Sequence, residues 1–220
     1  MIEVRVEPEL LVKADEFSKF RENCKNYLTR VGMNYDKFTM VKHDSIIGYI
    51  SEYIVAQYLR DNLPNGFIVS SWMVENDIAN IYKAVNNDDV SKAEMVKNYF
   101  YDKYDIKVTT PTKKQYCIDV KTALTAKEPS KSWDFMYPVI QAAKEGKEYA
   151  ILAYCIAEFE KIVKVDIIGY LQISDVSKCN VIKAHEKTKF HTESQIDNYE
   201  TKLGRDFHNI QELIDIIKEG

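Results

Sequence analysis

The sequence predicts a mixed α/β fold with one core, built on a central mixed β-sheet of four to six strands flanked by helices. Near both ends of the chain, apolar residues recur every three or four positions, which is typical of amphipathic helices. Between these stretches, apolar and polar residues alternate in several short runs, which is typical of strands. A chain of 220 residues is long enough to bury one sizeable core, so we expect a single domain over 1–220.

The helical period predicts long helices over 9–30 and 45–61, with Asp44 as the N-cap of the second. A polar stretch rich in Asn and Asp follows, and it predicts two short helices, the later one over 90–101. A last amphipathic helix is expected over 209–218.

Alternating or apolar runs predict five strands. They cover 67–74, 106–109, 116–121, 149–156 and 161–168. The second and third are joined by a short turn sequence that begins with a proline, so they are expected to form a hairpin.

The remaining segments are less regular. A helix is expected over 138–145, and 174–206 is interpreted as irregular. We expect the catalytic residues to lie in a core over about 45–170, and the chain from about 170 to 220 to form a basic extension that contacts DNA.

Composition narrows the class of protein. The formal net charge is −4, so no overall basic charge indicates a nucleic-acid partner. The four cysteines are widely spaced and are expected to be reduced. The sequence shows no secretory signal pattern and no apolar stretch of membrane-spanning length, so we expect a cytoplasmic protein.

An acidic residue two positions before a lysine is the motif of interest. It occurs four times, at Asp105–Lys107, Asp119–Lys121, Glu145–Lys147 and Glu200–Lys202. With 34 acidic and 30 basic residues, that many are expected by chance, so the setting of each must decide. The last two lie at a helix end and in a polar stretch and are interpreted as solvated surface.

Asp119 and Lys121 lie in a predicted strand and therefore point to the same face, about 7 Å apart along the strand. Burying both charges is costly unless something compensates, and a divalent metal ion is one such compensation. A strand with one solvent-facing side explains the same alternation without any site.

Two further carboxylates favour a site. Asp105 begins the partner strand of the same hairpin and can lie close to Asp119. Glu52 interrupts an apolar stripe of the helix over 45–61 and is expected to face inward, where a lone carboxylate is expensive. Two carboxylates beside a lysine can hold a hard cation and activate water.

The segment 117–122, with Asp119 and Lys121, resembles the second half of the PD-(D/E)XK nuclease motif. The form is the Asp-x-Lys variant of some type II restriction endonucleases. The resemblance extends to a helix acid ahead of the motif, an acid that opens a hairpin strand, and a helix and strand after it. This chain has Tyr104 where the family has a proline before the first acid.

Two alternatives for the acidic residues stay open. Asp102 competes with Asp105 as the first metal acid. In another register, Asp105 and Lys107 form the acid-x-Lys element, with Asp88 or Asp89 upstream.

The resemblance implies a sequence-specific endonuclease that hydrolyses double-stranded DNA with Mg²⁺ as cofactor and acts as a homodimer. It implies that Asp105 and Asp119 hold the metal with the backbone carbonyl of Val120 and with Glu52. Lys121 would orient or help to deprotonate the attacking water. The expected products are a 5′-phosphate and a 3′-hydroxyl.

Basic side chains flank these acids and are predicted to contact the DNA backbone. They are Lys113, Lys114, Lys127, Lys131, Lys183, Lys187 and Lys189, with Trp133 as an aromatic contact. An ordinary lysine-rich surface, and a Trp133 that anchors the core, are the alternative interpretations. Amides within 170–206 are expected to read bases.

Two other functions compete with a restriction enzyme. A repair or junction-resolving nuclease would share the same core. A non-catalytic DNA-binding module would carry the acid–lysine strand only as surface. No glycine-rich phosphate loop and no G-x-S-x-G sequence occurs, so an NTPase or serine hydrolase is poorly supported.

Overall fold

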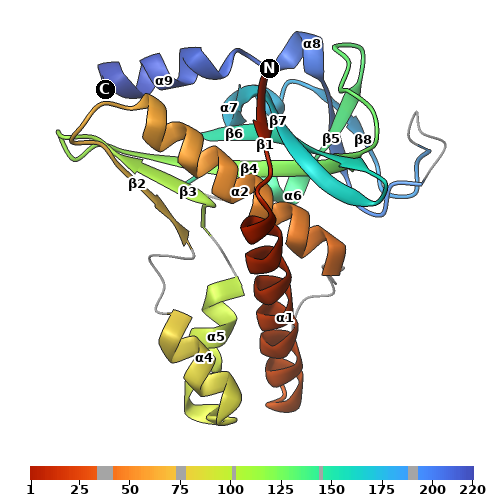
Figure 1. Ribbon diagram of the computed structural model, residues 1–220. Coiled ribbons are helices and arrows are strands. Elements are labelled where there is room, and N and C mark those ends of the chain that lie inside the picture. Colours follow the sequence, from red (N-terminus) through yellow and green to blue (C-terminus); the bar gives the residue numbers. More distant parts are fainter. Residues whose placement is uncertain (34–41, 73–77, 101–102, 144–145, 188–192) are drawn as a thin grey trace.

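The structure, a computed structural model, is a mixed α/β fold, as predicted (Figure 1). It describes residues 1–33, 42–72, 78–100, 103–143, 146–187 and 193–220. Among these residues, no helix combines the length and the apolar character needed to cross a lipid bilayer.

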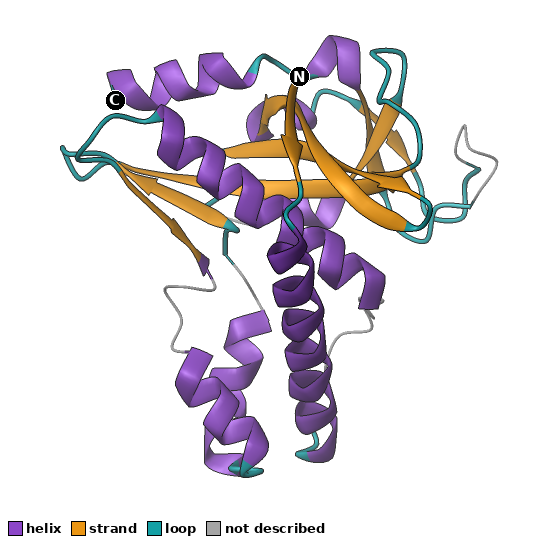
Figure 2. Ribbon diagram, viewed as in Figure 1, coloured by secondary structure: helices purple, strands orange, loops and turns teal. Residues whose placement is uncertain are grey.

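A sheet forms the centre of the molecule (Figure 2). It has six strands, in the order β1-β7-β6-β4-β3-β2. Its strands are β1 (Ile2–Arg5), β2 (Ile68–Ser71), β3 (Ile106–Thr109), β4 (Gln115–Thr125), β6 (Tyr149–Glu158) and β7 (Lys161–Gln172). β4 and β6 pair in parallel, whereas the other neighbours are antiparallel. A parallel pair needs a long crossover, and the chain between β4 and β6 supplies it.

A second, three-stranded sheet lies in the order β5-β9-β8. It consists of β5 (Asp134–Pro138), β8 (Asn180–Ile182) and β9 (Asn198–Lys202), accompanied by the one-turn helices α6 (Val139–Ala142), α7 (Ile173–Val176) and α8 (Leu203–Asp206). Two predictions were wrong here. The described part of 174–206 contains β8, β9 and α8 and is therefore not irregular throughout. Within 138–143, the expected helix is the single turn α6, which follows β5.

The other described helices have eight residues or more, apart from one 3₁₀ turn. They are α1 (Pro8–Arg30), α2 (Lys42–Asn62), α4 (Ile78–Asn86), the 3₁₀ turn η1 (Val90–Lys92), α5 (Ala93–Phe100) and α9 (Ile210–Glu219). Asp44 lies in the first turn of α2 and is not its N-cap, because the helix begins at Lys42. The cap of α9 is Asn209, whose side chain accepts a hydrogen bond from the Gln211 amide.

The two faces of the central sheet are covered differently. Helices α2 and α9 pack against one face, where Ile54 and Leu213 join Ile118 in one buried apolar cluster. On the other face, Tyr137 of β5 packs with Ala150 of β6 in a separate cluster. The small sheet therefore covers the face of β4 and β6 that the long helices leave open.

A helical arm projects from the sheet (Figure 1). It consists of the C-terminal half of α1 together with α4, η1 and α5, which the chain inserts between β2 and β3. Its own apolar cluster holds Cys24, Leu28, Ile81 and Val96. The arm therefore has a core of its own and shares α1 with the sheet.

Candidate functional site: a buried acid–lysine cluster

Asp105 lies alongside the middle of β4. Its backbone N–H donates to the Ile118 carbonyl at 3.1 Å, and its Oδ2 accepts the Val120 N–H at 2.6 Å. These two bonds hold Asp105 against the backbone on either side of Asp119. The hairpin turn between β3 and β4 makes this possible, because it pairs Ile106 directly with Ile118.

Asp119 is fully buried and accepts from three side chains. Tyr137 Oη donates to its Oδ2 at 2.8 Å, and Lys121 Nζ lies 2.6 Å from the same oxygen. Lys147 Nζ donates to the other oxygen, Oδ1. We call Asp105, Asp119, Lys121, Tyr137 and Lys147 the acid–lysine cluster.

The two lysines of the cluster differ in accessibility. The Lys121 side chain is 20% exposed, and its Nζ lies 5.7 Å from the centre of the Tyr137 ring. The Lys147 side chain is only 1% exposed. Lys121 can therefore reach solvent or a ligand, whereas Lys147 belongs to the interior.

Electrostatics fix the protonation of the cluster. Burial raises the pKa of Asp119, but the charges of Lys121 and Lys147 outweigh it, and the pKa falls below its ordinary value. Burial raises the pKa of Tyr137, and the negative charges of Asp119 and Asp105 raise it further. Asp119 is thus ionised at neutral pH, and Tyr137 keeps the proton that it donates.

Two sequence-based interpretations were wrong at this site. Lys147, interpreted as solvated surface, is buried against Asp119. Asp119 lies on a covered face of the sheet, because Tyr137 of the small sheet packs over it. The available signal was position: Lys147 comes two residues before β6, the most apolar strand of the chain, whose register places it beside β4.

Glu52 lies on α2 and is half-buried. Its neighbour Ser51 donates to Thr122 Oγ1 at 2.8 Å, so α2 packs against the face of β4 to which Thr122 points. Side chains alternate along a strand, and Asp119 points to the opposite face. The helix that carries Glu52 therefore does not share a face with Asp119, contrary to the expected grouping.

The alternative register is not supported by the placement of its acids. Asp88 pairs with Arg30 of the helical arm at 2.5 Å. Asp89 caps η1 by accepting from the Ser91 amide. Both lie in the arm, whereas Lys107 is on β3. Asp102, the competing first acid, lies outside the described residues.

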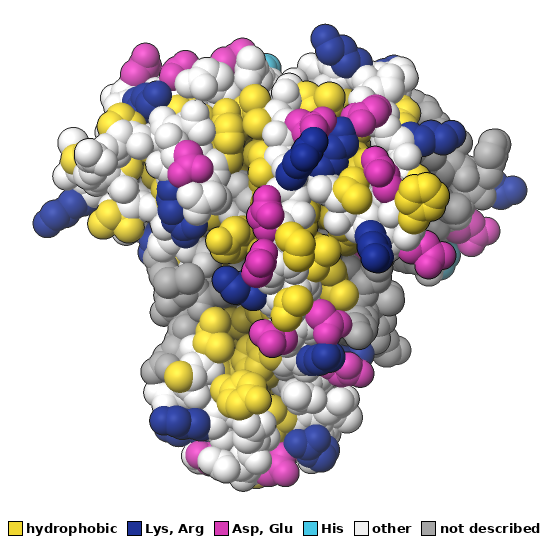
Figure 3. All heavy atoms as spheres, viewed as in Figure 1, with side chains coloured by type: hydrophobic (Ala, Val, Ile, Leu, Met, Phe, Trp, Pro, Cys, Tyr) yellow, Lys and Arg dark blue, Asp and Glu magenta, His cyan; other side chains and the backbone are white. Residues whose placement is uncertain are grey.

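The predicted DNA-contacting lysines lie in several places. Lys113 and Lys114 form the exposed turn before β4, and Lys127 and Lys131 lie in the exposed loop after it. These four therefore flank β4 at its two ends. On the face that Figure 3 shows, basic side chains are interspersed with acidic ones.

The other residues predicted to contact DNA differ in exposure and pairing. Lys183 pairs with Asp197 at 2.8 Å, Lys187 is exposed, and Lys189 lies outside the described residues. Trp133 is half-buried and packs edge-on against Tyr154, with ring centres 5.9 Å apart. That contact agrees with its interpretation as a core anchor.

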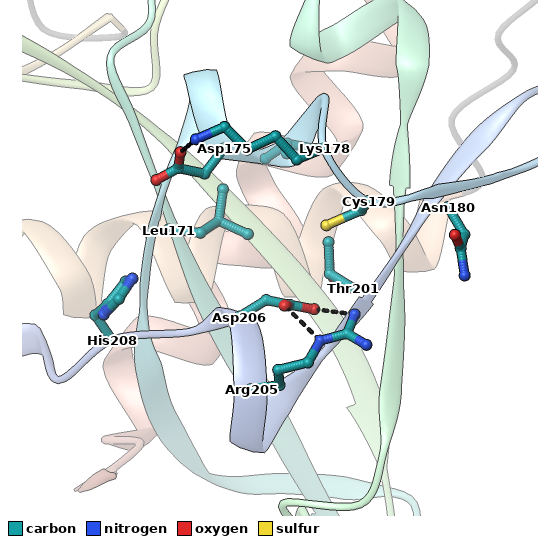
Figure 4. Close-up of a pocket in the computed structure, with 10 residues that line it drawn as sticks. Leu171, Asp175, Lys178, Cys179, Asn180, Thr201, Arg205, Asp206 and His208 are labelled. Carbon is teal, nitrogen blue, oxygen red and sulfur yellow. Dashed lines mark hydrogen bonds and ion pairs between the residues drawn. The ribbon is translucent and has the colours of Figure 1, made fainter.

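A cavity of about 400 Å³ lies apart from the acid–lysine cluster, beside α7, α8 and β9 (Figure 4). Asp175 and Lys178 pair at its rim, and Arg205 pairs with Asp206 through two hydrogen bonds. These charges neutralise each other within the protein. Asn180, one of the amides in the predicted base-reading segment, also lines it.

The donors of the cluster fit a hard cation in chemical type. Mg²⁺ is commonly held by one or two carboxylates together with water and substrate phosphates, and Asp105 with Asp119 supplies two carboxylates. Within the described ranges, no group of three or more His, Cys, Asp or Glu side chains is arranged to hold a metal ion. A metal at Asp119 must also displace a lysine ammonium from it.

Comparison with known proteins gave no match to a family model, to a curated protein or to a solved structure.

Proposed function

We propose that this protein is a Mg²⁺-dependent endonuclease of the PD-(D/E)XK kind that cleaves double-stranded DNA at a specific sequence, as a type II restriction enzyme does. The observation that carries the proposal is the placement of Asp105 beside Asp119, with Lys121 paired to Asp119. Two carboxylates near a partly exposed lysine are groups that metal-assisted phosphodiester hydrolysis can use, because a metal can activate water and neutralise charge on the phosphate.

The order of elements adds support. A helix (α2) precedes the β3–β4 hairpin, and α6 and β6 follow it, in the order that the resemblance implies. The parallel β4–β6 pair places the strand after the crossover next to the strand with Asp119 and Lys121. The remaining described elements extend the central sheet with β1, β2 and β7, cover it with α9, and build the arm and the small sheet.

The roles of the side chains follow from their accessibility. Asp105 and Asp119, with the Val120 carbonyl, would hold Mg²⁺, which lowers the pKa of bound water and neutralises charge on the reacting phosphate. Lys121 would contact the scissile phosphate or orient the water. Tyr137 would fix the Asp119 carboxylate by its hydrogen bond. The role of Glu52 as a further ligand stays a prediction.

One observation favours a second candidate, a non-catalytic DNA-binding module. Asp119 already accepts from two lysines and a tyrosine, as the centre of a purely structural ion-pair network would. In that case Lys121 would stabilise the fold without contacting a substrate.

Digestion of a plasmid of mixed sequence separates the candidates. With Mg²⁺, the wild-type protein is expected to give discrete fragments, and Lys121→Met is expected to give none. Lys19→Met, which removes an exposed lysine of α1, is the matched control and should cut like the wild type. Absence of cleavage with any divalent metal would remove the nuclease proposal.

A parallel digestion with branched DNA identifies the type of nuclease. Cleavage of junctions but not of plain duplex would indicate a repair or junction-resolving enzyme. A restriction enzyme that cuts both strands of a palindrome is expected to be a two-fold homodimer. A molar mass of two chains in light scattering, 2 × 25.6 kDa, would show it.

A further inference from the structure

Lys147 is a buried cation that faces Asp119, and the proposed mechanism gives it no part. We propose that Lys147 is a built-in counter-ion that weakens metal binding at Asp119 and so sets how much metal the site needs. This inference rests on the proposed function, because it concerns the affinity of the same site for its cation.

The two oxygens of Asp119 are divided between different partners. Oδ2 accepts from the buried Tyr137 and lies 2.6 Å from Nζ of Lys121, which is 20% exposed, so Lys121 is the partner of this oxygen that can move toward solvent. Oδ1 faces Lys147, which is 1% exposed. A metal that arrives from the accessible side would therefore meet Oδ2, and Lys121 can turn outward to make room. Lys147 has less freedom to withdraw, because only 1% of its side chain is exposed.

The charge of Lys147 is expected to have a large effect on metal affinity. Lys121 and Lys147 set two positive charges against the buried Asp119 carboxylate. After Lys121 has turned toward a substrate, Lys147 still cancels the charge of that carboxylate and repels a divalent cation. In a partly buried site, one unit charge a few ångströms away changes a cation's affinity by about ten-fold or more. Removing the charge of Lys147 should therefore strengthen metal binding.

Direct metal binding tests this inference without relying on activity. The full chain is titrated with Mn²⁺, and free Mn²⁺ is followed by its electron paramagnetic resonance signal. Lys147→Met is expected to bind about ten-fold more tightly than the wild type, or better. Lys147→Arg keeps the charge and is expected to bind like the wild type. Lys178→Met removes an exposed lysine paired with Asp175 and is the matched control.

A double variant ties the gain to this site. Adding Asp119→Asn to Lys147→Met should abolish the tighter binding, because the oxygen that gains from the lost charge is gone. If circular dichroism shows that Lys147→Met is unfolded, Lys147→Gln removes the same charge while keeping a donor toward Asp119.

Failure of this inference differs from failure of the proposed function. Metal binding that depends on Asp119 but does not tighten in the charge-removing variants would overturn the counter-ion role and leave the nuclease proposal standing. A comparable gain in Lys178→Met would overturn it as well. If no variant binds Mn²⁺ through Asp119, both the counter-ion role and the metal-dependent function are wrong.

Discussion

Two buried carboxylates in this protein have pKa values that shift in opposite directions. The pKa of Asp119 falls, because two lysine charges outweigh its burial. The pKa of Asp166 on β7 rises, because burial dominates and Lys164, 3.7 Å away, compensates only in part. The neighbouring Glu128 and Glu3 raise it further. The difference lies in the number of cations that each carboxylate faces.

The raised pKa of Asp166 predicts a pH-dependent effect on stability. Between the unfolded-state pKa of about 3.9 and the raised folded-state value, the folded protein binds more protons than the unfolded chain. The contribution of Asp166 therefore becomes unfavourable as pH rises through this window. Asp166→Asn removes it, so the free energy of unfolding of the variant relative to wild type should increase as pH rises from about 3 to about 7.

Urea unfolding at several pH values measures that difference. Asp61→Asn, at the exposed end of α2, removes one charge elsewhere and serves as the matched control. A difference for Asp166→Asn that stays constant or shrinks with rising pH would contradict the assignment.

At the scale of the elements, helix α9 is stabilised both by its N-cap and by its apolar face. Helix α9 buries Ile210, Leu213, Ile214 and Ile217 against the sheet. Its first turn is satisfied by Asn209, whose Oδ1 accepts from the Gln211 amide at 3.0 Å. Helix formation here depends on both, because a ten-residue helix is marginal without packing.

Removal of the Asn209 cap is expected to cause a modest loss of stability. Asn209→Ala leaves the Gln211 amide without its acceptor and should lower the free energy of unfolding by about 1 kcal/mol. Asn209→Ser keeps an oxygen for the cap and should lie close to the wild type. Chemical denaturation of the three proteins checks this, and equal losses in both variants would show that the side-chain cap contributes nothing.

Elements with strong local patterns could be predicted, and those defined by distant pairing could not. The periods of α1 and α2 and the alternation of the β3–β4 hairpin depend on neighbouring residues, so these elements and the pairing of Ile106 with Ile118 could be predicted. Strand β5 pairs with β9, some sixty residues further along the chain. Nothing local signals that pairing, and the Tyr137 that it brings over Asp119 was missed with it.

Lys147 was missed for the same reason. It follows Gly146, whose positive φ ends the crossover between α6 and β6, and its local pattern indicates surface. Its burial depends on the parallel pairing of β4 with β6, which sets Glu148 against Cys117 through a backbone hydrogen bond of 3.0 Å. The sequence therefore indicated Asp119 and its partner Lys121, but not Lys147 and Tyr137, which contact the same carboxylate from distant parts of the chain.

At the scale of the whole molecule, α1 joins two cores. Its first turns contribute Leu10 and Ala14 to the cluster of the central sheet, and its later turns contribute Cys24 and Leu28 to the cluster of the helical arm. Separate apolar clusters often open independently. The arm is therefore expected to be a unit that can unfold while the sheet, with the acid–lysine cluster, stays closed.

Leu28→Ala tests this independence. The side chain is fully buried in the arm, and its truncation should cost about 2–5 kcal/mol of local stability. Hydrogen exchange followed by mass spectrometry should then show faster exchange in α4 and α5, while peptides from β4 and β6 keep their protection. Ile151→Ala, fully buried in the sheet, is the matched control and should speed exchange in β4 and β6. If Leu28→Ala raised exchange equally in arm and sheet, the two cores would form one cooperative unit, because opening of the arm would then require opening of the strand that carries Asp119.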